Sequence, residues 1–146
     1  MLLTKTCNYA IRAALYVAVH KEHEPVPIGE ISRDLHISFH LLTKILQKLT
    51  QRRITKSSRG PKGGVSLAKS AKAITLLEII MAVDGEGIFQ KCLIGLDQCD
   101  GSHPCPLHVS WRAQRERIRS NLANATLAKL AGRMRRNGLR ISNRPN

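Results

Sequence analysis

The segment 38–67 constrains the fold most, because an amphipathic helical pattern runs there into two short strand-like stretches around a glycine-rich turn. Its apolar residues recur at spacings of three and four, which gathers them on one face of a helix. These residues are Leu41, Leu42, Ile45, Leu46 and Leu49. Ser38 is a good N-cap for such a helix. The segment therefore predicts a helix whose other face carries polar and basic side chains.

A hairpin and a preceding helix complete this pattern. Residues 54–58 and 65–67 are strand-like, and the glycines between them permit the positive φ angles of a tight turn. Upstream, residues 28–35 have a helical period, and a short turn separates them from Ser38. Two helices joined by a short turn and followed by a hairpin predict a winged helix-turn-helix. The expected fold class is mainly α with a small β-hairpin wing.

No acidic residue lies between Asp34 and Glu78, whereas the same stretch is rich in lysine and arginine. Its basic residues are Lys44, Lys48, Arg52, Arg53, Lys56, Arg59, Lys62, Lys69 and Lys72. A field of one sign at this density is typical of a surface that contacts a phosphate backbone, and an α-helix fits the major groove. Aromatic residues make up only 3%, which favours duplex DNA over single strands that need stacking platforms. The side chains expected to face DNA are Ser38, His40, Thr43, Lys44, Gln47, Lys48 and Lys62.

The net charge of +14 is spread along the chain, with 13 basic and 5 acidic residues in 1–83 and 11 and 5 in 84–146. Acidic partners are therefore expected. No apolar run approaches the roughly 18 residues of a membrane span, and the N-terminus lacks the pattern of a secretory signal. We expect a cytoplasmic protein without a membrane partner, in which thiols stay reduced.

Further helical patterns set the domain division. We expect four parts: a winged helix-turn-helix DNA-binding domain over residues 1–83, a cysteine-rich cluster-binding loop over 84–105, dimerisation helices over 106–136 and a basic flexible tail over 137–146. The helix expected over 106–121 has Trp111 and Ile118 among its apolar residues, and its arginines, Arg115 included, are expected to be exposed. A long helix outside a small winged domain commonly supplies a dimer interface. The sequence thus predicts a homodimer that binds a palindromic operator.

Three cysteines and one histidine follow the predicted DNA-binding domain at short intervals. Six residues separate Cys92 from Cys99, five separate Cys99 from Cys105, and His108 lies three positions after Cys105. If Cys105 and His108 both lie on the first turn of a helix, this spacing places them on one face. Three thiolates and an imidazole suit either an iron-sulfur cluster or zinc. The spacing alone leaves both open. Cys7 stands apart and is expected to be a small buried apolar residue.

The order of these features resembles the bacterial iron-sulfur regulator family that includes IscR and NsrR. The likeness covers about residues 1–134 and rests on LTKTCNYAIRA, SSRGPKGGVSLAK, AVDGE, the spaced cysteines and CPLHVSW. It implies a homodimeric winged-helix transcription factor, a repressor, whose cluster senses iron-sulfur status, iron, redox state or nitric oxide. It also implies that Cys92, Cys99 and Cys105 are cluster ligands and that Arg59 of the wing enters the minor groove.

The fourth ligand separates subgroups of that family. In IscR-like members a histidine three residues after the last cysteine completes a [2Fe-2S] site, and His108 matches that pattern. In NsrR-like members an aspartate in the first helix of the other subunit caps a [4Fe-4S] cluster, whereas this chain has Asn8, whose neutral amide is a poor ligand for iron. The resemblance therefore favours [2Fe-2S] over [4Fe-4S], with Asn8 as an alternative residue near the cluster. Thr43 stands where IscR has an acidic residue on the recognition helix, so the operator preference of IscR cannot be transferred to this chain.

Two other functions compete with this interpretation. One is a zinc-based or thiol-based winged-helix regulator without a cluster, and the other is a basic RNA-associated or ribosome-associated protein. An enzyme is not expected, because the sequence lacks a motif of paired carboxylates, a phosphate-binding loop and a recognisable nucleophile with its base. No small-molecule substrate is therefore expected.

Overall fold

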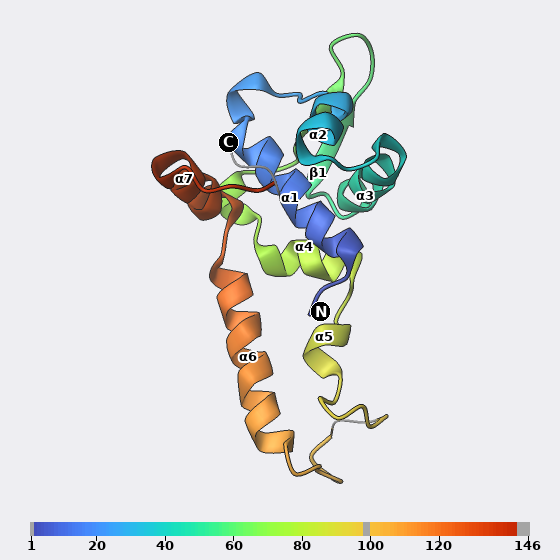
Figure 1. Cartoon of the computed structure of the whole chain (residues 1–146), viewed down its shortest axis with the longest axis vertical. Coiled ribbons are helices and arrows are strands. Elements are labelled where there is room, and N and C mark those ends of the chain that lie inside the picture. Colours follow the sequence, from blue (N-terminus) through green and yellow to red (C-terminus); the bar gives the residue numbers. More distant parts are fainter. Residues whose placement is uncertain (1, 98–99, 143–146) are drawn as a thin grey trace.

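The structure, a computed structural model, describes residues 2–97 and 100–142 (Figure 1). Over these residues the chain forms α-helices, two short 3-10 helices and one antiparallel hairpin. The elements are α1 Lys5–Val19, α2 Ile28–Leu35, α3 Phe39–Gln51, β1 Thr55–Ser58, β2 Gly64–Leu67, α4 Leu76–Val83, α5 Gly87–Gln90, α6 His108–Asn124 and α7 Leu127–Asn137, with 3-10 turns at Lys21–His23 and Ala71–Ala73. The predicted fold class, a mainly helical winged helix-turn-helix, is confirmed.

The main core lies where α1 packs against α2, α3, α4, α7 and the hairpin. The buried side of α1 is rich in alanine, and Ala10, Ala13 and Ala14 are fully buried. Small side chains on α1 let the neighbouring helices approach it closely, and the larger side chains of those helices fill the core around it. The predicted apolar face of α3 is confirmed, because Leu42, Ile45, Leu46 and Leu49 are buried and Leu41 is half-buried.

Four helices begin at a serine or threonine whose side chain accepts a hydrogen bond from a backbone N–H three residues later. The caps are Thr4 for α1, Ser38 for α3, Thr75 for α4 and Thr126 for α7. Each cap typically contributes about 1 kcal/mol to helix stability. The predicted N-cap of the recognition helix is confirmed. The 3-10 turn Ala71–Ala73 precedes α4, which begins at Leu76 directly after its cap Thr75.

The hairpin pairs β1 with β2 in the register Thr55 to Leu67 and Ser58 to Gly64. Val26, from the segment before α2, adds an antiparallel bridge to Val65 and ties the hairpin to the helix-turn-helix. Gly64 has to be glycine at this point, because a Cβ atom there would collide with the backbone carbonyl of Val26. The wing is thus fixed at its base while its tip projects away from the domain, as Figure 1 shows.

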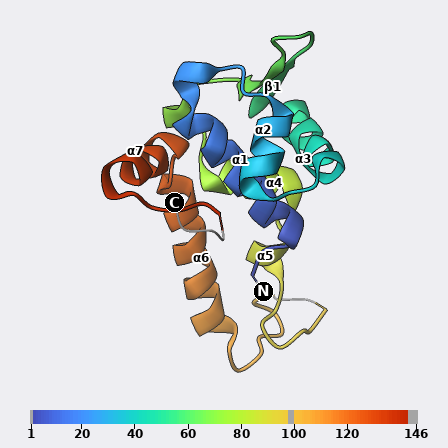
Figure 2. The ribbon, with the colours of Figure 1, turned by 45° about the horizontal axis from the view of Figure 1, so that its top comes forward.

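The helices α5 and α6 extend away from α1–α4, and the segment between them lies at the end of the molecule opposite the wing (Figures 1 and 2). A second apolar cluster holds this extension, with Cys7, Ile80 and Phe89 at its centre and Ile118 and Leu122 of α6 packed against it. The short helix α5 lies inside the stretch predicted as a loop, because Phe89 is buried in that cluster. The prediction that Arg115 is exposed is wrong, since only 7% of its surface is accessible.

The end of the described chain packs back on the DNA-binding domain. Arg12 of α1 donates from Nε to the carbonyl of Ile141 at 2.6 Å, and Ile141 packs against the main core. The Nη2 atom of Arg12 donates to the carbonyl of Leu35, at the end of α2, at 2.8 Å. One arginine therefore links the C-terminal segment to the helix-turn-helix.

Among the described residues, no helix has the length and apolar character needed to cross a membrane.

Candidate DNA interface and cysteine loop

The outer face of α3 carries the predicted DNA-contacting side chains. His40, Lys44, Gln47 and Lys48 are exposed. Thr43 is half-buried and donates its hydroxyl to the carbonyl of Phe39 at 2.8 Å. Because the opposite face of α3 is buried, the polar face has a fixed direction. The predicted outward orientation is confirmed for the four exposed residues but not for the half-buried Thr43, while the contacts of all five with DNA stay a prediction.

The turn between α2 and α3 is held by short-range hydrogen bonds. His36 ends α2 in the left-handed conformation with φ of 52°. Ser32 donates its hydroxyl to the carbonyl of Ile37 at 2.7 Å, and the N–H of Ile37 donates to the carbonyl of Ser32 at 3.1 Å. Together with the bond from Arg12 to Leu35, these contacts fix the angle between the two helices. The arrangement presents α3 as a rigid unit.

A buried tyrosine links α1 to α2 beneath this unit. The hydroxyl of Tyr16 lies 2.6 Å from Asp34 and 3.0 Å from Glu30, and its ring stacks on His20 with centroids 4.0 Å apart. Burial and the two carboxylates raise the pKa of Tyr16 well above its ordinary value. The hydrogen bond from Tyr16, with help from Arg33, lowers the pKa of Asp34. Both carboxylates are thereby held on the side of α2 that faces α1.

The wing presents two cations from the turn between β1 and β2. Arg59 and Lys62 are both exposed. The turn is closed by the N–H of Gly63, which donates to the carbonyl of Gly60 at 2.9 Å, and Gly60 has φ of 101°, a conformation that favours glycine. This geometry is compatible with the predicted insertion of the wing beside a DNA backbone.

Sequence reasoning missed one residue of this surface. Phe39 is the first residue of α3, and 57% of its surface is exposed. The helical period does not reveal this exposure, because Phe39 lies three positions before the buried Leu42, at the edge of the apolar stripe. An exposed aromatic side chain at the start of a recognition helix is a candidate for contact with base edges.

The cysteine loop brings two of the three predicted thiol ligands together. The Sγ atoms of Cys92 and Cys105 lie 4.0 Å apart, and neither sulfur is in a disulfide. Cys99, the third predicted ligand, lies outside the described residues. His108 is buried, and its backbone N–H donates to the carbonyl of Cys105 at 2.9 Å. Within the part of the chain that the structure describes, no three histidine, cysteine or acidic side chains gather closely enough to hold a metal ion.

The separation of the two sulfurs fits thiolates that share one metal ion. A tetrahedral metal with sulfur ligands at about 2.3 Å holds neighbouring sulfurs roughly 3.8 Å apart. The 4.0 Å between Cys92 and Cys105 is close to this value and far longer than the roughly 2.05 Å of a disulfide. The donor set present is therefore chemically suited to iron or zinc. It does not by itself distinguish between them.

The N-terminal third of α1 holds the other two residues singled out from the sequence. Cys7 is fully buried in the second apolar cluster, which confirms the prediction of a small buried residue. Burial raises the pKa of its thiol to about 12, and the nearby Asp84 carboxylate adds to this shift. Cys7 is therefore an unreactive thiol. Asn8 is half-buried on α1, whereas Cys92 and Cys105 belong to the segment between α5 and α6, which lies at the end of the molecule opposite the wing (Figure 1).

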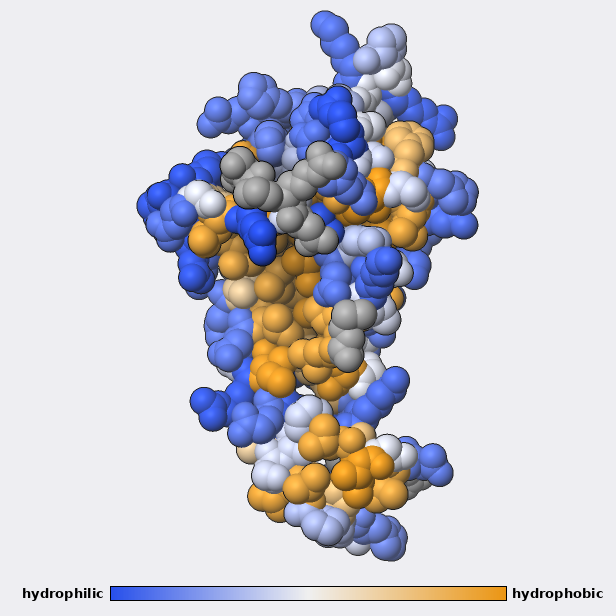
Figure 3. Space-filling view, viewed as in Figure 1, coloured by the Kyte–Doolittle hydropathy of each residue, from blue (hydrophilic) through white to orange (hydrophobic). Residues whose placement is uncertain are grey.

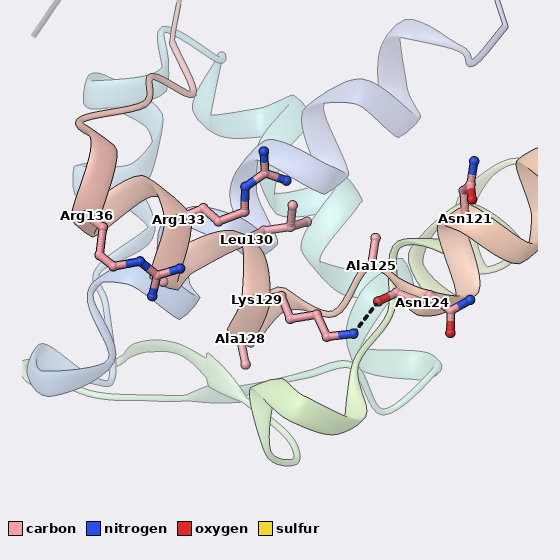
Figure 4. A pocket seen from close by; sticks show the side chains of 9 residues that line it. Asn121, Asn124, Ala125, Ala128, Lys129, Leu130, Arg133 and Arg136 are labelled. Carbon is pink, nitrogen blue, oxygen red and sulfur yellow. Dashed lines mark hydrogen bonds between the residues drawn. The ribbon is translucent and has the colours of Figure 1, made fainter.

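A shallow basic hollow of about 520 Å³ lies where α6 meets α7 (Figure 4). Its charged side chains, Lys129, Arg133 and Arg136, all come from α7, and Lys129 Nζ donates to the carbonyl of Asn124 at 3.1 Å. None of its lining residues is acidic, a cysteine, a serine or a histidine. The charged groups of the hollow are therefore all cations.

The helix-turn-helix, the hairpin wing and the one-sign charge of their surface define a winged-helix regulator of the DNA-binding class. A family model described as the iron-dependent transcriptional regulator Rrf2 matches residues 3–133. The chain belongs to the Rrf2 family of transcriptional regulators, and the predicted likeness to the IscR-containing family is confirmed.

Relatives and solved structures agree with this membership. The HTH-type transcriptional regulator IscR of Erwinia tasmaniensis is 41% identical over 130 residues, which cover 89% of this chain and 78% of that protein. IscR of Yersinia pseudotuberculosis is 40% identical over 130 residues, with 89% and 79% covered. CymR, the global cysteine regulator of B. subtilis, has a similar fold with a TM-score of 0.75 at 22% identity, covering 89% and 95% of the two chains. The structure of T. potens IscR gives a TM-score of 0.72 at 21% identity, covering 94% and 91%.

Proposed function

We propose that this Rrf2 regulator is a homodimeric repressor whose binding to a palindromic operator is controlled by a [2Fe-2S] cluster. Its ligands would be Cys92, Cys99, Cys105 and His108. The observation that carries the proposal is the 4.0 Å approach of the Cys92 and Cys105 sulfurs, beside a buried histidine one helical turn after Cys105. When bound, such a cluster supplies a group that responds to iron supply, redox state or nitric oxide.

The proposed ligands are held by α6. The N–H of His108 is bonded to the carbonyl of Cys105, so the first turn of α6 connects two of the four residues. The carbonyl of Lys91, which precedes Cys92, accepts hydrogen bonds from Trp111 and Arg115 of the same helix. Outer contacts of this kind orient ligands and strengthen metal binding. The family description as iron-dependent and the IscR relatives favour iron over zinc.

A dimer is supported by apolar surface that the protomer leaves open. Figure 3 shows a band of apolar surface down the middle of the molecule, between α6 and α5 and below α4. Half-buried residues packed against the second apolar cluster come from α4, α5 and α6, and also from α1 and the residues before it; they are Leu3, Ile11, Leu77, Met81, Val83, Ile88, Ile118 and Leu122. Apolar surface of this kind on a protein of 146 residues is typical of an interface between protein chains. A second copy of the chain would align two recognition helices for a two-fold symmetric operator.

The first test is the metal content of protein purified without oxygen. The proposal predicts a red or brown protein that contains iron and sulfide in the proportions of [2Fe-2S]. Alanine at Cys92 or Cys105, and at Cys99, should remove the colour and leave a folded protein. Cys7→Ala is the matched control, since Cys7 is buried in the core and should not affect the colour. A colourless wild-type protein that contains zinc would contradict the cluster and support the zinc-based regulator.

His108→Ala tests the fourth ligand separately. We expect a labile cluster or a changed spectrum rather than complete loss, because water or a thiol can replace one ligand of four. The second test compares cluster-loaded and cluster-free wild-type protein on genomic DNA fragments. The proposal predicts a difference in affinity for at least one promoter fragment. A cluster can control DNA binding only if it binds the DNA-free and the DNA-bound arrangement of the protein with different affinities. Identical binding of both forms to every fragment would contradict control by the cluster.

A further inference from the structure

Phe39 is 57% exposed and belongs to neither of the two apolar clusters of the protomer. Among residues 28–67, all of which the structure describes, no other large apolar side chain is as exposed. The apolar face of α3 that contributes to the core comprises Leu42, Ile45, Leu46 and Leu49. Burying a phenylalanine side chain is worth about 1.5 to 3 kcal/mol, so an exposed one forgoes a large stabilisation. The chain therefore keeps an aromatic ring at a solvent-facing position of the recognition helix.

The first turn of α3 fixes where this ring lies. Ser38 caps the helix by accepting a hydrogen bond from the N–H of Leu41 at 3.3 Å, and the hydroxyl of Thr43 donates to the carbonyl of Phe39 at 2.8 Å. The second bond occupies the hydroxyl of Thr43. The exposed hydrogen-bonding side chains that follow Phe39 on α3 are then His40, Lys44, Gln47, Lys48 and Gln51. Phe39 is the apolar member of this group.

The position of Phe39 determines what it can meet on DNA. Helix-turn-helix proteins contact base edges with the N-terminal residues of the recognition helix. In the major groove, the C5-methyl of thymine is the apolar group on the base edges, and phenylalanine is one of the side chains that contact it. We infer that Phe39 contacts a thymine methyl group in each half-site and makes the operator preference depend on thymine there. This inference rests on the proposed function, since it requires binding to duplex DNA.

The experiment removes the methyl group alone. A preferred duplex is first selected from a random pool with the full chain, and each thymine is then replaced in turn by uracil, which pairs identically but lacks the C5-methyl. For the wild type we expect one thymine in each half-site at which uracil weakens binding about fourfold. This factor corresponds to about 0.8 kcal/mol, the scale for burying one methyl or methylene group. With Phe39→Ala the same replacement should have no effect.

Two further variants make the result specific. Phe39→Leu keeps an apolar contact and should retain part of the penalty. Leu139→Ala removes a side chain of similar exposure, 45%, that lies after α7 and outside the helix-turn-helix, and should retain the full wild-type penalty. Circular dichroism should be unchanged for all three variants, because the removed side chains are exposed.

Two outcomes would overturn the inference while leaving the proposed function in place. One is a wild type that binds its selected site equally well with uracil at every thymine position. The other is a uracil penalty that persists at full size in Phe39→Ala, since another residue would then read the methyl group. A full chain that selects no duplex sequence would overturn the inference together with operator binding itself. The three results are distinct, because only the last lacks a selected site.

Discussion

The indole Nε1 of Trp111 donates a hydrogen bond of 3.0 Å to the backbone carbonyl of Lys91. Lys91 directly precedes Cys92, so this bond fixes the backbone from which one thiol approaches Cys105. Arg115, one turn later on α6, donates to the same carbonyl at 3.2 Å. The position of the thiol pair is therefore coupled to α6, the helix proposed to form the dimer.

Replacing Trp111 by phenylalanine should weaken cluster retention without unfolding the protein. The ring remains, but the donor to the Lys91 carbonyl is lost, and the loss of such an outer contact typically lowers metal affinity about 10-fold or more. The measurement is the decay of visible absorbance in the presence of an iron chelator. Val109→Ala, a change at an 80% exposed residue of the same helix, is the control and should decay like the wild type. Equal decay of all three proteins would show that the bond does not support the cluster.

Ile118→Glu should convert the proposed dimer into monomers. Ile118 is half-buried in the apolar band beside α5, and an unpaired carboxylate in such a contact costs roughly 3 kcal/mol, which would raise the dimer Kd about 100-fold. Light scattering across a concentration series measures the change, and circular dichroism verifies the fold. Gln114→Glu, at an exposed position of α6, adds the same charge and should remain dimeric. A wild type that is itself monomeric at micromolar concentration would refute the dimer.

The DNA-binding half of the fold is readable from the sequence because its signals are local. The apolar spacing of α3, the Ser38 cap and the glycines of the wing each act within a few residues. The exposure of Phe39 is local too, but it is visible only once the buried face of α3 is fixed. The helical period alone does not tell which apolar residue at the edge of a stripe will be covered by another element.

The cysteine half is harder to predict, because its structure depends on contacts between distant residues. Arginine is rarely buried, and the burial of Arg115 follows from a carbonyl 24 residues earlier in the chain. The helix α5 has only four residues and forms because Phe89 finds an apolar cluster built by α1, α4 and α6. The spacing of the cysteines in the sequence allows Cys92 and Cys105 to come together but does not predict that they do. Its 4.0 Å distance depends on the fold of the intervening loop.

Tyr16→Phe should destabilise the helix-turn-helix at neutral pH, by about 1 kcal/mol, the scale of a hydrogen bond to a partly exposed carboxylate. The Tyr16 hydroxyl lowers the pKa of Asp34 from its ordinary 3.8, so its contribution is present above the unfolded pKa and is lost as the pH falls through the folded pKa. Urea denaturation over an acidic pH series should thus show the wild type and the variant converging at low pH. Tyr9→Phe, the same change at the other tyrosine of α1, is the control. A difference that stays constant into strong acid would exclude this linkage.

Arg59→Ala should weaken binding to the selected operator more than Lys62→Ala does. Both side chains are exposed on the wing turn, so neither change should alter stability by more than a few tenths of a kcal/mol. A guanidinium in a narrow minor groove responds to its width and potential, whereas a lysine at the tip mainly neutralises a phosphate. We therefore expect Arg59→Ala to cost roughly 1 to 3 kcal/mol on the operator and less on random DNA, and Lys62→Ala to cost a similar small amount on both. Affinities measured at two salt concentrations separate the effects, because loss of a phosphate contact lowers the salt dependence by about one ion. Equal losses for the two variants on operator and random DNA would show that Arg59 acts only as a backbone contact.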